Sequence, residues 1–273
     1  MIAKLKRYNL LIMKITGGIK KKLDKLNLVA GLFHLFGAGI ILGWAKDGAD
    51  WPITTNYLSF DVFTSKLEPS IKQIGTINLP LVVALFFLLS AGFHFAVRFF
   101  YNKKYYQDLE QGINKFRWIE YSISASTMMI GISILSGIYD LSSLIMIFSL
   151  TSIMNLMGLV MELWNNNRAK LNLPTSWLSY VIGCFSGIIP WVVFVIYVMA
   201  ASKFGGGNIP TFVYWIYVSI FLFFNCFAVN MYLQYKKVGK WSKYLYGEKV
   251  YIILSLVAKT ILAWQVFAGS LRP

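Results

Sequence analysis

The stretch YIILSLVAKTILAWQVFAG, residues 251–269, holds one charged residue, Lys259, near its centre. As a helix rising 1.5 Å per residue, a run of this length crosses the roughly 30 Å hydrocarbon core of a bilayer. A charged side chain at the middle of an isolated membrane helix costs about 2.5–3.5 kcal/mol on insertion scales. The stretch therefore predicts a membrane-spanning helix whose lysine is retained for a chemical reason.

The whole chain has the same apolar texture. Of its 273 residues, 57% are hydrophobic and only 14% are charged, whereas soluble domains carry about 25% charged residues. Lipid cannot satisfy open backbone groups, and the alternating pattern of a membrane barrel is absent. We therefore predict an all-α membrane protein, a bundle of seven transmembrane helices. The predicted spans are residues 27–45, 77–99, 117–138, 141–163, 176–200, 210–234 and 250–270.

Two segments outside the spans have their own character. Residues 1–26 are basic and lack the small-residue cleavage site of a signal peptide, so we expect a basic cytoplasmic segment before a single domain over 27–270. The connection 46–76 contains Thr54–Phe63, which is rich in β-branched and aromatic residues. This composition predicts a short extracellular β-hairpin in the first outer loop.

The positive charge is distributed unevenly between the two sides of the membrane. Twenty of the 26 Lys and Arg residues fall before the first span or in the 2–3, 4–5 and 6–7 connections; five fall on the opposite side, and Lys259 remains. The positive-inside rule then predicts a multi-pass cell-membrane protein with a cytoplasmic N-terminus and an extracellular C-terminus. The charge of +15 thus reports topology and attraction to anionic lipid headgroups, and it does not indicate nucleic-acid binding.

Few ionisable residues lie within the predicted spans, and such residues are functional candidates by default. They are His34, His94, Glu120, Glu162 and Lys259. Counting residues from the span ends places four of them in the cytoplasmic half, namely His34, His94, Glu120 and Lys259, with Lys259 close to the midplane. Glu162 ends the fourth span beside Trp164 and polar residues, so we interpret it as reaching to the interface.

A buried lysine can act as a nucleophile, because desolvation favours its neutral amine. A neutral amine forms a Schiff base with an aldehyde, and the protonated product needs a nearby anion. Glu120 is the best intramembrane carboxylate for that role. The alternative is an inert structural ion pair between Glu120 and Lys259. His34 and His94 could instead hold a metal ion, although no metal site is our main expectation. Cys184 and Cys226 are expected to be buried free thiols.

Three stretches resemble one family of retinal proteins, the heliorhodopsins. RWIEYSISASTMMIGISILSGIYDL (117–141), LTSIMNLMGLVMEL (150–163) and SLVAKTILAWQVFAGSLRP (255–273) look like the third, fourth and seventh helices of that family. The inverted orientation expected from the charge distribution is also a mark of heliorhodopsins. The resemblance runs through all seven spans.

The resemblance implies a role for individual residues. Lys259 would carry all-trans retinal, and Glu120 would be the sole counterion. Ser255 would form a hydrogen bond near the Schiff base, at the position where pumping relatives usually carry an aspartate. Gly131 stands where a proton pump has its internal donor, and the outer Asp140 is interpreted as a solvated turn residue. The remaining residues of a polar, water-containing inner cavity would be His34, His94, Ser124 and Arg117. For Arg117 the alternative is an orientation toward the lipid headgroups.

A retinal slot also needs large apolar side chains. The candidates on the third to sixth spans are Met128, Met154, Trp191, Trp215, Tyr217, Phe223 and Phe224. The resemblance further implies a homodimer assisted by strands in the first outer loop. Two small-residue motifs, Gly39/Gly43 and Gly183/Gly187, permit close helix approach.

We therefore expect a light-sensing photoreceptor that is not an enzyme, signals to an unidentified cytoplasmic partner and does not pump ions. The alternative is a light-gated proton channel or transporter, which would give a sustained current during illumination. A seven-helix enzyme or lipid-binding protein with an inert Lys259–Glu120 pair is the third possibility, and it would fail to bind retinal.

Overall fold

The computed structural model describes residues 15–44, 50–206 and 209–271. Several basic residues that entered the sidedness prediction lie outside these ranges, namely Lys4, Lys6, Arg7, Lys14, Lys46 and Arg272. Within the described ranges, seven helices are long and apolar enough to cross a membrane. The prediction of an all-α bundle with seven spans is confirmed.

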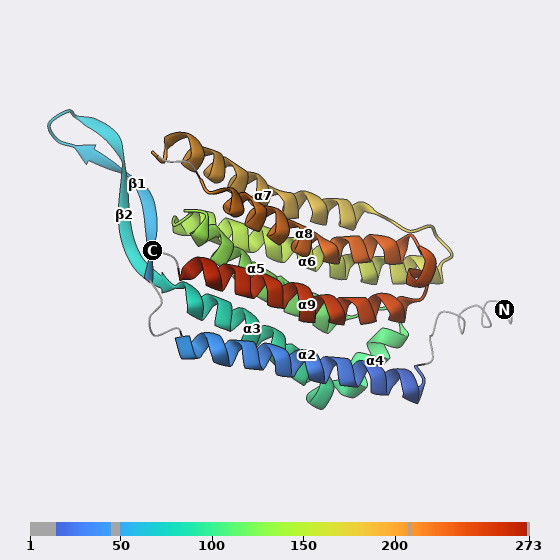
Figure 1. Cartoon of the computed structure of the whole chain (residues 1–273). Coiled ribbons are helices and arrows are strands. Elements are labelled where there is room, and N and C mark those ends of the chain that lie inside the picture. Colours follow the sequence, from blue (N-terminus) through green and yellow to red (C-terminus); the bar gives the residue numbers. More distant parts are fainter. Residues whose placement is uncertain (1–14, 45–49, 207–208, 272–273) are drawn as a thin grey trace.

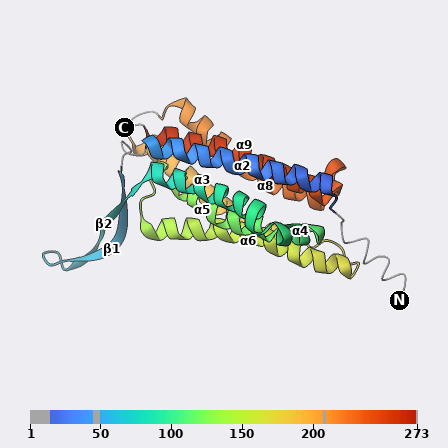
Figure 2. The ribbon, with the colours of Figure 1, turned by 90° about the horizontal axis from the view of Figure 1, so that it is seen from below.

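The seven long helices run roughly along one axis, with a hairpin projecting from one end (Figures 1 and 2). They are α2 (Gly17–Trp44), α3 (Leu79–Phe95) with its π-helical extension η2 (Ala96–Phe100), α5 (Lys115–Leu135), α6 (Leu141–Lys170), α7 (Leu178–Phe204), α8 (Thr211–Tyr235) and α9 (Tyr244–Ser270). Helices adjacent in the ring pack on one another: α2 on α3 and α9, α3 on α5, α5 on α6, α6 on α7, and α8 on α9.

Polar side chains define where several of these helices begin. Asn78 Oδ1 accepts from the Leu81 amide before α3, Asn114 Oδ1 from the Arg117 amide before α5, and Asp140 Oδ2 from the Ser143 amide before α6. Each cap satisfies an amide of the first helical turn that has no partner inside the helix. Asp140 is thus a helix cap in the turn between two spans.

The predicted hairpin is present and longer than Thr54–Phe63. Strand β1 (Asp50–Asp61) pairs antiparallel with β2 (Lys66–Asn78), with an irregularity between Ile53 and Thr54. The Thr54 amide donates to Tyr139 O at 2.9 Å, and the Trp51 ring lies 5.9 Å from that of Tyr139. The base of the hairpin is therefore attached to the turn between α5 and α6.

The structure adds helix where the sequence predicted polar connections. Helix α2 begins at Gly17, ten residues before the expected span, and the connection 100–116 contains a short helix, α4 (Asn102–Glu110). Tyr106 on α4 donates a hydrogen bond to Asp24 on α2 at 2.8 Å. These parts lack the uniform apolar character of a span, but they bury one face each against their neighbours.

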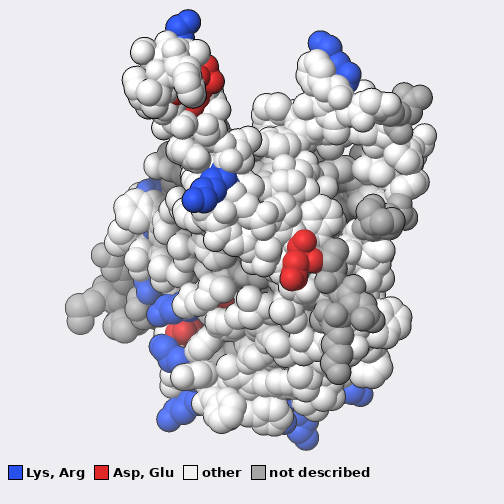
Figure 3. Space-filling model, turned by 90° about the vertical axis from the view of Figure 1, so that its left-hand side faces the viewer, with Lys and Arg blue, Asp and Glu red and all other residues white. Residues whose placement is uncertain are grey.

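The two ends of the bundle differ in charge. We call the end that carries α4 and the 3-10 turn η3 (Gly239–Ser242) the basic end, and the opposite one the hairpin end. Figure 3 shows the hairpin end as mostly uncharged surface with isolated basic and acidic residues. The described basic residues at this end are Lys66, Lys72 and Lys203. The described Lys and Arg residues gather at the basic end, on the first turns of α2, on α4 and around η3.

The part of the bundle between Lys259 and the hairpin end has an apolar core. Its fully buried residues include Met128, Met129, Ile132, Val266 and Phe267. Among the described residues, the Asp and Glu residues within helices α2–α9 are Glu120, which contacts Lys259, and five that belong to the basic-end parts of their helices: Asp24, Asp108, Glu110, Glu162 and Glu248. The bundle therefore has a dry half and a polar half.

Only one of the two small-residue motifs serves packing inside the chain. A side-chain carbon added at Gly187 would collide with Met154 on α6, and one at Gly183 would lie 3.2 Å from Met157. Carbons added at Gly39 or Gly43 would meet nothing within 4 Å. The motif at Gly183 and Gly187 therefore allows α7 to approach α6 closely.

The cysteines are free, as predicted, but only partly enclosed. Cys226 is half-buried and Cys184 is exposed, so the expectation of two buried thiols is wrong for Cys184. A bundle helix faces lipid on one side, and an apolar sequence alone does not indicate which side that is.

Candidate functional site

Lys259 lies inside the bundle with all three of its ammonium hydrogens engaged. Its Nζ donates to Glu120 Oε1 at 2.5 Å, to Ser124 Oγ at 2.9 Å and to Ser90 Oγ at 2.9 Å. Both members of the ion pair are almost wholly buried, with side-chain exposures of 4% for Lys259 and 5% for Glu120. The helices α3, α5 and α9 thus build one polar site around a single lysine.

Neighbouring groups hold this pair in place. Ser90 Oγ donates to Glu120 Oε1 at 2.9 Å while it accepts from Lys259, so it bridges the two charges. The rings of Tyr121 and Phe86 lie 4.6 Å and 5.3 Å from Nζ, within the range of a cation–π contact. A buried ion pair is tolerated when its remaining hydrogen-bonding capacity is satisfied in this way.

The two histidines meet on the basic-end side of the pair. Their rings are stacked with centroids 5.8 Å apart. His94 Nδ1 lies 2.8 Å from Asn27 Oδ1, which can only accept, so Nδ1 donates and Nε2 of neutral His94 accepts from Ser255 Oγ at 3.0 Å. Ser255 therefore contacts His94, one helical turn from Lys259. Both nitrogens of His34 are buried without a protein partner.

A small inner cavity of about 40 Å³ extends from this site toward the basic end. Glu120, Ser255 and His94 line one part of it, and Arg117 and Glu248 line another. A space of this size holds at least one water molecule, given a minimum of roughly 10–15 Å³ per water. Tyr105 of α4 also lines this cavity, and burial raises the pKa of its phenol to about 12.

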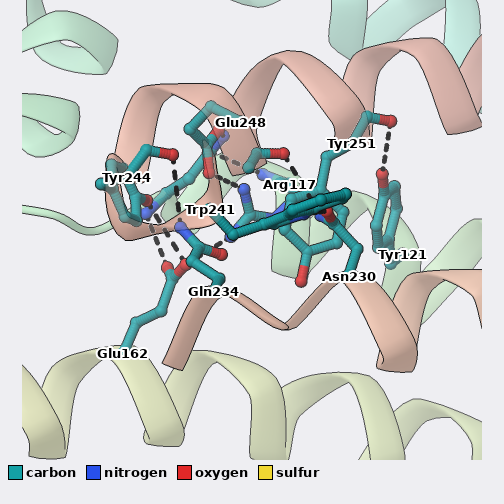
Figure 4. Close-up of polar contacts among 11 residues, drawn as sticks. Arg117, Tyr121, Glu162, Asn230, Gln234, Trp241, Tyr244, Glu248 and Tyr251 are labelled. Atoms are coloured by element: carbon teal, nitrogen blue, oxygen red, sulfur yellow. Dashed lines mark hydrogen bonds and ion pairs between the residues drawn. The ribbon is translucent and has the colours of Figure 1, made fainter. Parts of the chain in front are cut away.

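A second charged cluster closes the inner cavity at the basic end (Figure 4). The guanidinium of Arg117 forms ion pairs with Glu162 through Nη2 and with Glu248 through Nη1. The Asn114 amide donates to Glu162 at 2.8 Å and its side chain to Glu248 at 2.7 Å. The Tyr251 ring lies 3.9 Å from the guanidinium carbon. Three helices, α5, α6 and α9, are joined by this cluster.

This cluster corrects one interpretation and decides another. Glu162 is 1% exposed and paired with Arg117, so the interpretation that it reaches to the interface is wrong. Arg117, expected in the inner cavity, is buried and lines it. Position near a helix end gave the depth of both residues correctly, but the compensating partners come from other helices.

A larger cavity of about 520 Å³ begins at Lys259 and runs between α5, α6, α7 and α8. Its wall is mainly apolar and aromatic, and it includes Trp118, Tyr121, Met154, Trp191 and Phe224. The exposed Val181 and Phe185 also belong to its lining, so the cavity reaches the lipid-facing side of α7. Its volume lies within the range of about 300–1,000 Å³ that is usual for ligand pockets.

Three of the predicted pocket residues, Met154, Trp191 and Phe224, line this cavity, and four do not. Met128 is fully buried in the apolar core, and Trp215 is 67% exposed on the outside of α8. Tyr217 donates a hydrogen bond to Ser136 near the hairpin end, and Phe223 packs against the core. Trp215 is turned outward by the rotation of α8, whereas Met128, Tyr217 and Phe223 pack in or against the apolar core, outside the lining of this cavity.

Several residues of the site were missed by sequence reasoning. Ser90 and Asn27 gave no signal, since isolated polar residues are common in membrane helices. Glu248 lies in the basic 6–7 connection, two residues before the predicted span, and was not considered as a site residue. The presence of a carboxylate among lysines at the edge of a span was the only feature of the sequence that pointed to Glu248. Asn114 was not recognised as a helix cap that also contacts two carboxylates.

No group of three or more His, Cys, Asp or Glu side chains in the described ranges could hold a metal ion. The stacked pair of His34 and His94 therefore has no third ligand of these types in that part of the chain.

The fold and the buried lysine–carboxylate pair define a seven-helix membrane protein with the rhodopsin architecture. Cyanorhodopsin from the cyanobacterium Tolypothrix sp. is structurally similar, with a TM-score of 0.54 over 93% of this chain and 95% of that one. At 14% identity this similarity concerns the fold alone. A search of curated proteins gave no match.

The heliorhodopsin family model matches residues 23–271, and the chain belongs to the heliorhodopsin family. Heliorhodopsins are photoreceptor-type retinal proteins and not classical enzymes. The resemblance seen in the sequence is thereby confirmed.

Proposed function

We propose that this chain is a light-sensing photoreceptor that binds all-trans retinal at Lys259 and signals without pumping ions. The observation that carries the proposal is the position of Lys259 Nζ, which lies at one end of the large apolar cavity and 2.5 Å from Glu120. A long polyene aldehyde fits a cavity that is apolar along its length and offers an amine at its end. When bound, retinal would supply visible-light absorption and a photoisomerisable double bond through a Schiff base with this lysine.

The residues around Nζ have separate roles in this proposal. Glu120 is the counterion, because it is the carboxylate in contact with Nζ and no other Asp or Glu of the described residues reaches that atom. Ser90 and Ser124 orient the pair by hydrogen bonds. Ser255 holds His94, so that a proton leaving Nζ would enter a polar region toward the basic end.

The dry half of the bundle supports signalling over pumping. A vectorial pump needs proton-accepting and proton-donating groups on opposite sides of Lys259. Between Lys259 and the hairpin end, the described helices contain no carboxylate, and the buried positions there are filled by apolar side chains. A side-chain carbon added at Gly131, the donor position, would lie 3.3 Å from Val266 and 3.5 Å from Leu79, so this position is closely packed by apolar side chains. The light-gated proton channel is the alternative, and a sustained current under voltage clamp would favour it.

We further propose that the basic end faces the cytoplasm and that two chains form a dimer. Sixteen of the described Lys and Arg residues lie at or near the basic end, against three at the hairpin end, which supports a cytoplasmic N-terminus. The hairpin exposes several large apolar side chains suited to a second copy. They are Tyr57, Leu58, Phe60, Val62, Phe63, Leu67, Ile71 and Ile74. Accessibility of terminal tags in intact cells and the mass in detergent test these two points.

Reconstitution with all-trans retinal tests the photoreceptor proposal. The wild-type chain should give a visible absorption band, which Lys259→Ala should abolish and the control Lys249→Ala should retain. Glu120→Gln should move the band to longer wavelength, because it removes the anion that stabilises positive charge at Nζ; Glu110→Gln on α4 is its control. A band that survives in Lys259→Ala would refute the attachment site, and an unchanged band in Glu120→Gln would refute the counterion.

A further inference from the structure

The buried charges of the polar half do not balance. The described helices contain two buried cations, Lys259 and Arg117, and three carboxylates buried near them, Glu120, Glu162 and Glu248. A fourth buried carboxylate, Asp108 on α4, pairs separately with the exposed Lys104. Lys259 and Glu120 neutralise each other, which leaves one guanidinium between two carboxylates. Uncompensated charge in a low-dielectric interior is costly, and one added proton would neutralise this cluster.

Hydrogen bonding and access distinguish the two carboxylates. Glu162 accepts from the Asn114 amide, from Tyr244 Oη at 3.3 Å and from Arg117. Among the described residues, Glu248 accepts from the Asn114 side chain and Arg117 alone, and it lines the inner cavity that Glu120 and Ser255 also line. Glu162 is not part of that lining. A proton arriving through the cavity would therefore meet Glu248 first.

Glu248 also lies at a mechanically important place, in the first turns of α9. The connection that precedes it is held to α8 by side chains: Trp241 donates to Asn230 at 2.7 Å, Gln234 donates to Tyr244 O at 3.3 Å, and Asn230 donates to Gly247 O at 3.2 Å (Figure 4). The ion pair of Glu248 with Arg117 anchors this assembly to α5. We call residues 236–248, with these contacts, the α8–α9 latch.

We propose that Glu248 accepts the proton released from Lys259 Nζ, and that its neutralisation opens the α8–α9 latch. The proton leaves Nζ, which becomes neutral, and ends on a carboxylate oxygen of Glu248, which becomes a carboxylic acid; no other bond forms or breaks. Arg117 then pairs with Glu162 alone. The start of α9 and the turn η3 lose their ionic anchor. The inference rests on the proposed function only for the source of the proton.

The opened latch would change a strongly basic surface. Lys236, Lys237, Lys240, Lys243 and Lys249 lie in or beside it. A surface of this charge suits an anionic partner, and its rearrangement gives the proposed cytoplasmic signal a physical location.

Other titratable groups surround the cluster and must be separated from Glu248 in any pH experiment. They come from every helix that packs on it: His94 of α3, Tyr105 of α4, Tyr121 of α5, Glu162 of α6, Tyr235 of α8, and Tyr244 and Tyr251 of α9. The Glu248→Gln variant isolates the carboxyl group of interest, because it mimics the protonated form at constant shape.

Hydrogen–deuterium exchange of the retinal-free protein in nanodiscs tests the latch without any photochemistry. Glu248→Gln should exchange the backbone amides of 236–246 at least tenfold faster than wild type, with little change in α3 and α5. Glu110→Gln, which removes a carboxylate at the same end but outside the cluster, should match wild type. Wild type should show the same acceleration, after correction for intrinsic exchange, when the pH is lowered; this also covers a Glu248→Gln chain that does not fold. Unchanged exchange in 236–246 under both treatments overturns the latch.

Infrared difference spectroscopy of the retinal-bound protein tests the proton acceptor. Illumination should produce a carboxylic-acid C=O band that disappears in Glu248→Gln and persists in Glu110→Gln. A band that persists in Glu248→Gln overturns Glu248 as acceptor, even where exchange supports the latch. Absence of any visible absorption band in the wild type would count against the photoreceptor function and leave the exchange result standing.

Discussion

The contact between α5 and α6 at Gly158 allows a steric prediction for the substitution Gly158→Ala. A side-chain carbon built at Gly158 would lie 2.6 Å from both Cε3 and Cη2 of Trp118. Cζ3 of the same ring would lie closer still, and ordinary contact begins near 3.4 Å, so the indole must retreat by more than about 0.8 Å. The edge-on contacts of Trp118 with Tyr121 and Tyr251 oppose this movement, and its remaining free side is the large cavity, which a displaced indole would narrow.

The expected cost is that of overpacking a core, about 1–3 kcal/mol. At about 2–4 °C per kcal/mol for a chain of this size, the midpoint of thermal unfolding should fall by several degrees. The displaced indole should also shift the absorption band of the retinal-bound protein, because Trp118 and Lys259 line the same cavity.

Gly92→Ala on α3 is the matched control. An added carbon there meets nothing within 4 Å, and exchanging glycine for alanine inside a helix gains roughly 0.5–1 kcal/mol. Thermal unfolding followed by circular dichroism, with the absorption spectrum of each variant, separates the two cases. A Gly158→Ala protein as stable as Gly92→Ala, with an unshifted band, would refute the reasoning.

Three further predictions concern single side chains. Ser90→Ala removes the bridge between Lys259 and Glu120 but leaves the ion pair, so the absorption band should shift less than in Glu120→Gln; an equal shift would contradict this division of roles. Asp140→Ala should lose about 1 kcal/mol as a helix cap. Hydrogen bonds from Ser142 and Ser143 hold the pKa of Asp140 below its usual value. The stabilisation that Asp140 gives the folded protein is therefore present above the unfolded pKa of about 3.9 and is lost as the pH falls through the folded pKa. If the denaturation midpoints of wild type and Asp140→Ala do not converge on the acid side, this account of the cap is wrong. Burial raises the pKa of Tyr105 to about 12. The contribution of neutral Tyr105 to the stability of the fold is therefore complete below the unfolded pKa of about 10 and is lost as the pH rises through 12. An ultraviolet titration in which Tyr105→Phe removes a phenolate signal near pH 10 would exclude this.

The sequence was sufficient for the architecture and for the pairing of Lys259 with Glu120. Both follow from counting along apolar runs, because hydropathy gives the ends of a span and 1.5 Å per residue gives depth within it. The same counting placed His34 and His94 near that pair. The depth of a residue along the helix axis can therefore be predicted from a single sequence.

The side of a helix that faces the interior of the bundle cannot be predicted from the sequence in the same way. Lipid and the interior of a bundle are equally apolar, so the helices lack the polar face that tells a soluble helix which side is inward. This is why Trp215 was predicted in the cavity and lies outside, whereas Phe224 on the same helix lines it. The partners of Glu162 were hidden for the same reason, since Arg117 and Tyr244 approach it from other helices.

The division of the bundle into a dry half and a polar half has a consequence for membrane voltage. A potential across a bilayer falls mainly where the medium is least polarisable, which here is the apolar core from Met128 to Phe267. A full elementary charge crossing 100 mV exchanges about 2.3 kcal/mol, but a proton that moves from Lys259 toward the basic end crosses little of that field. The chemistry at Lys259 should therefore proceed at nearly the same rate in a polarised and a depolarised cell.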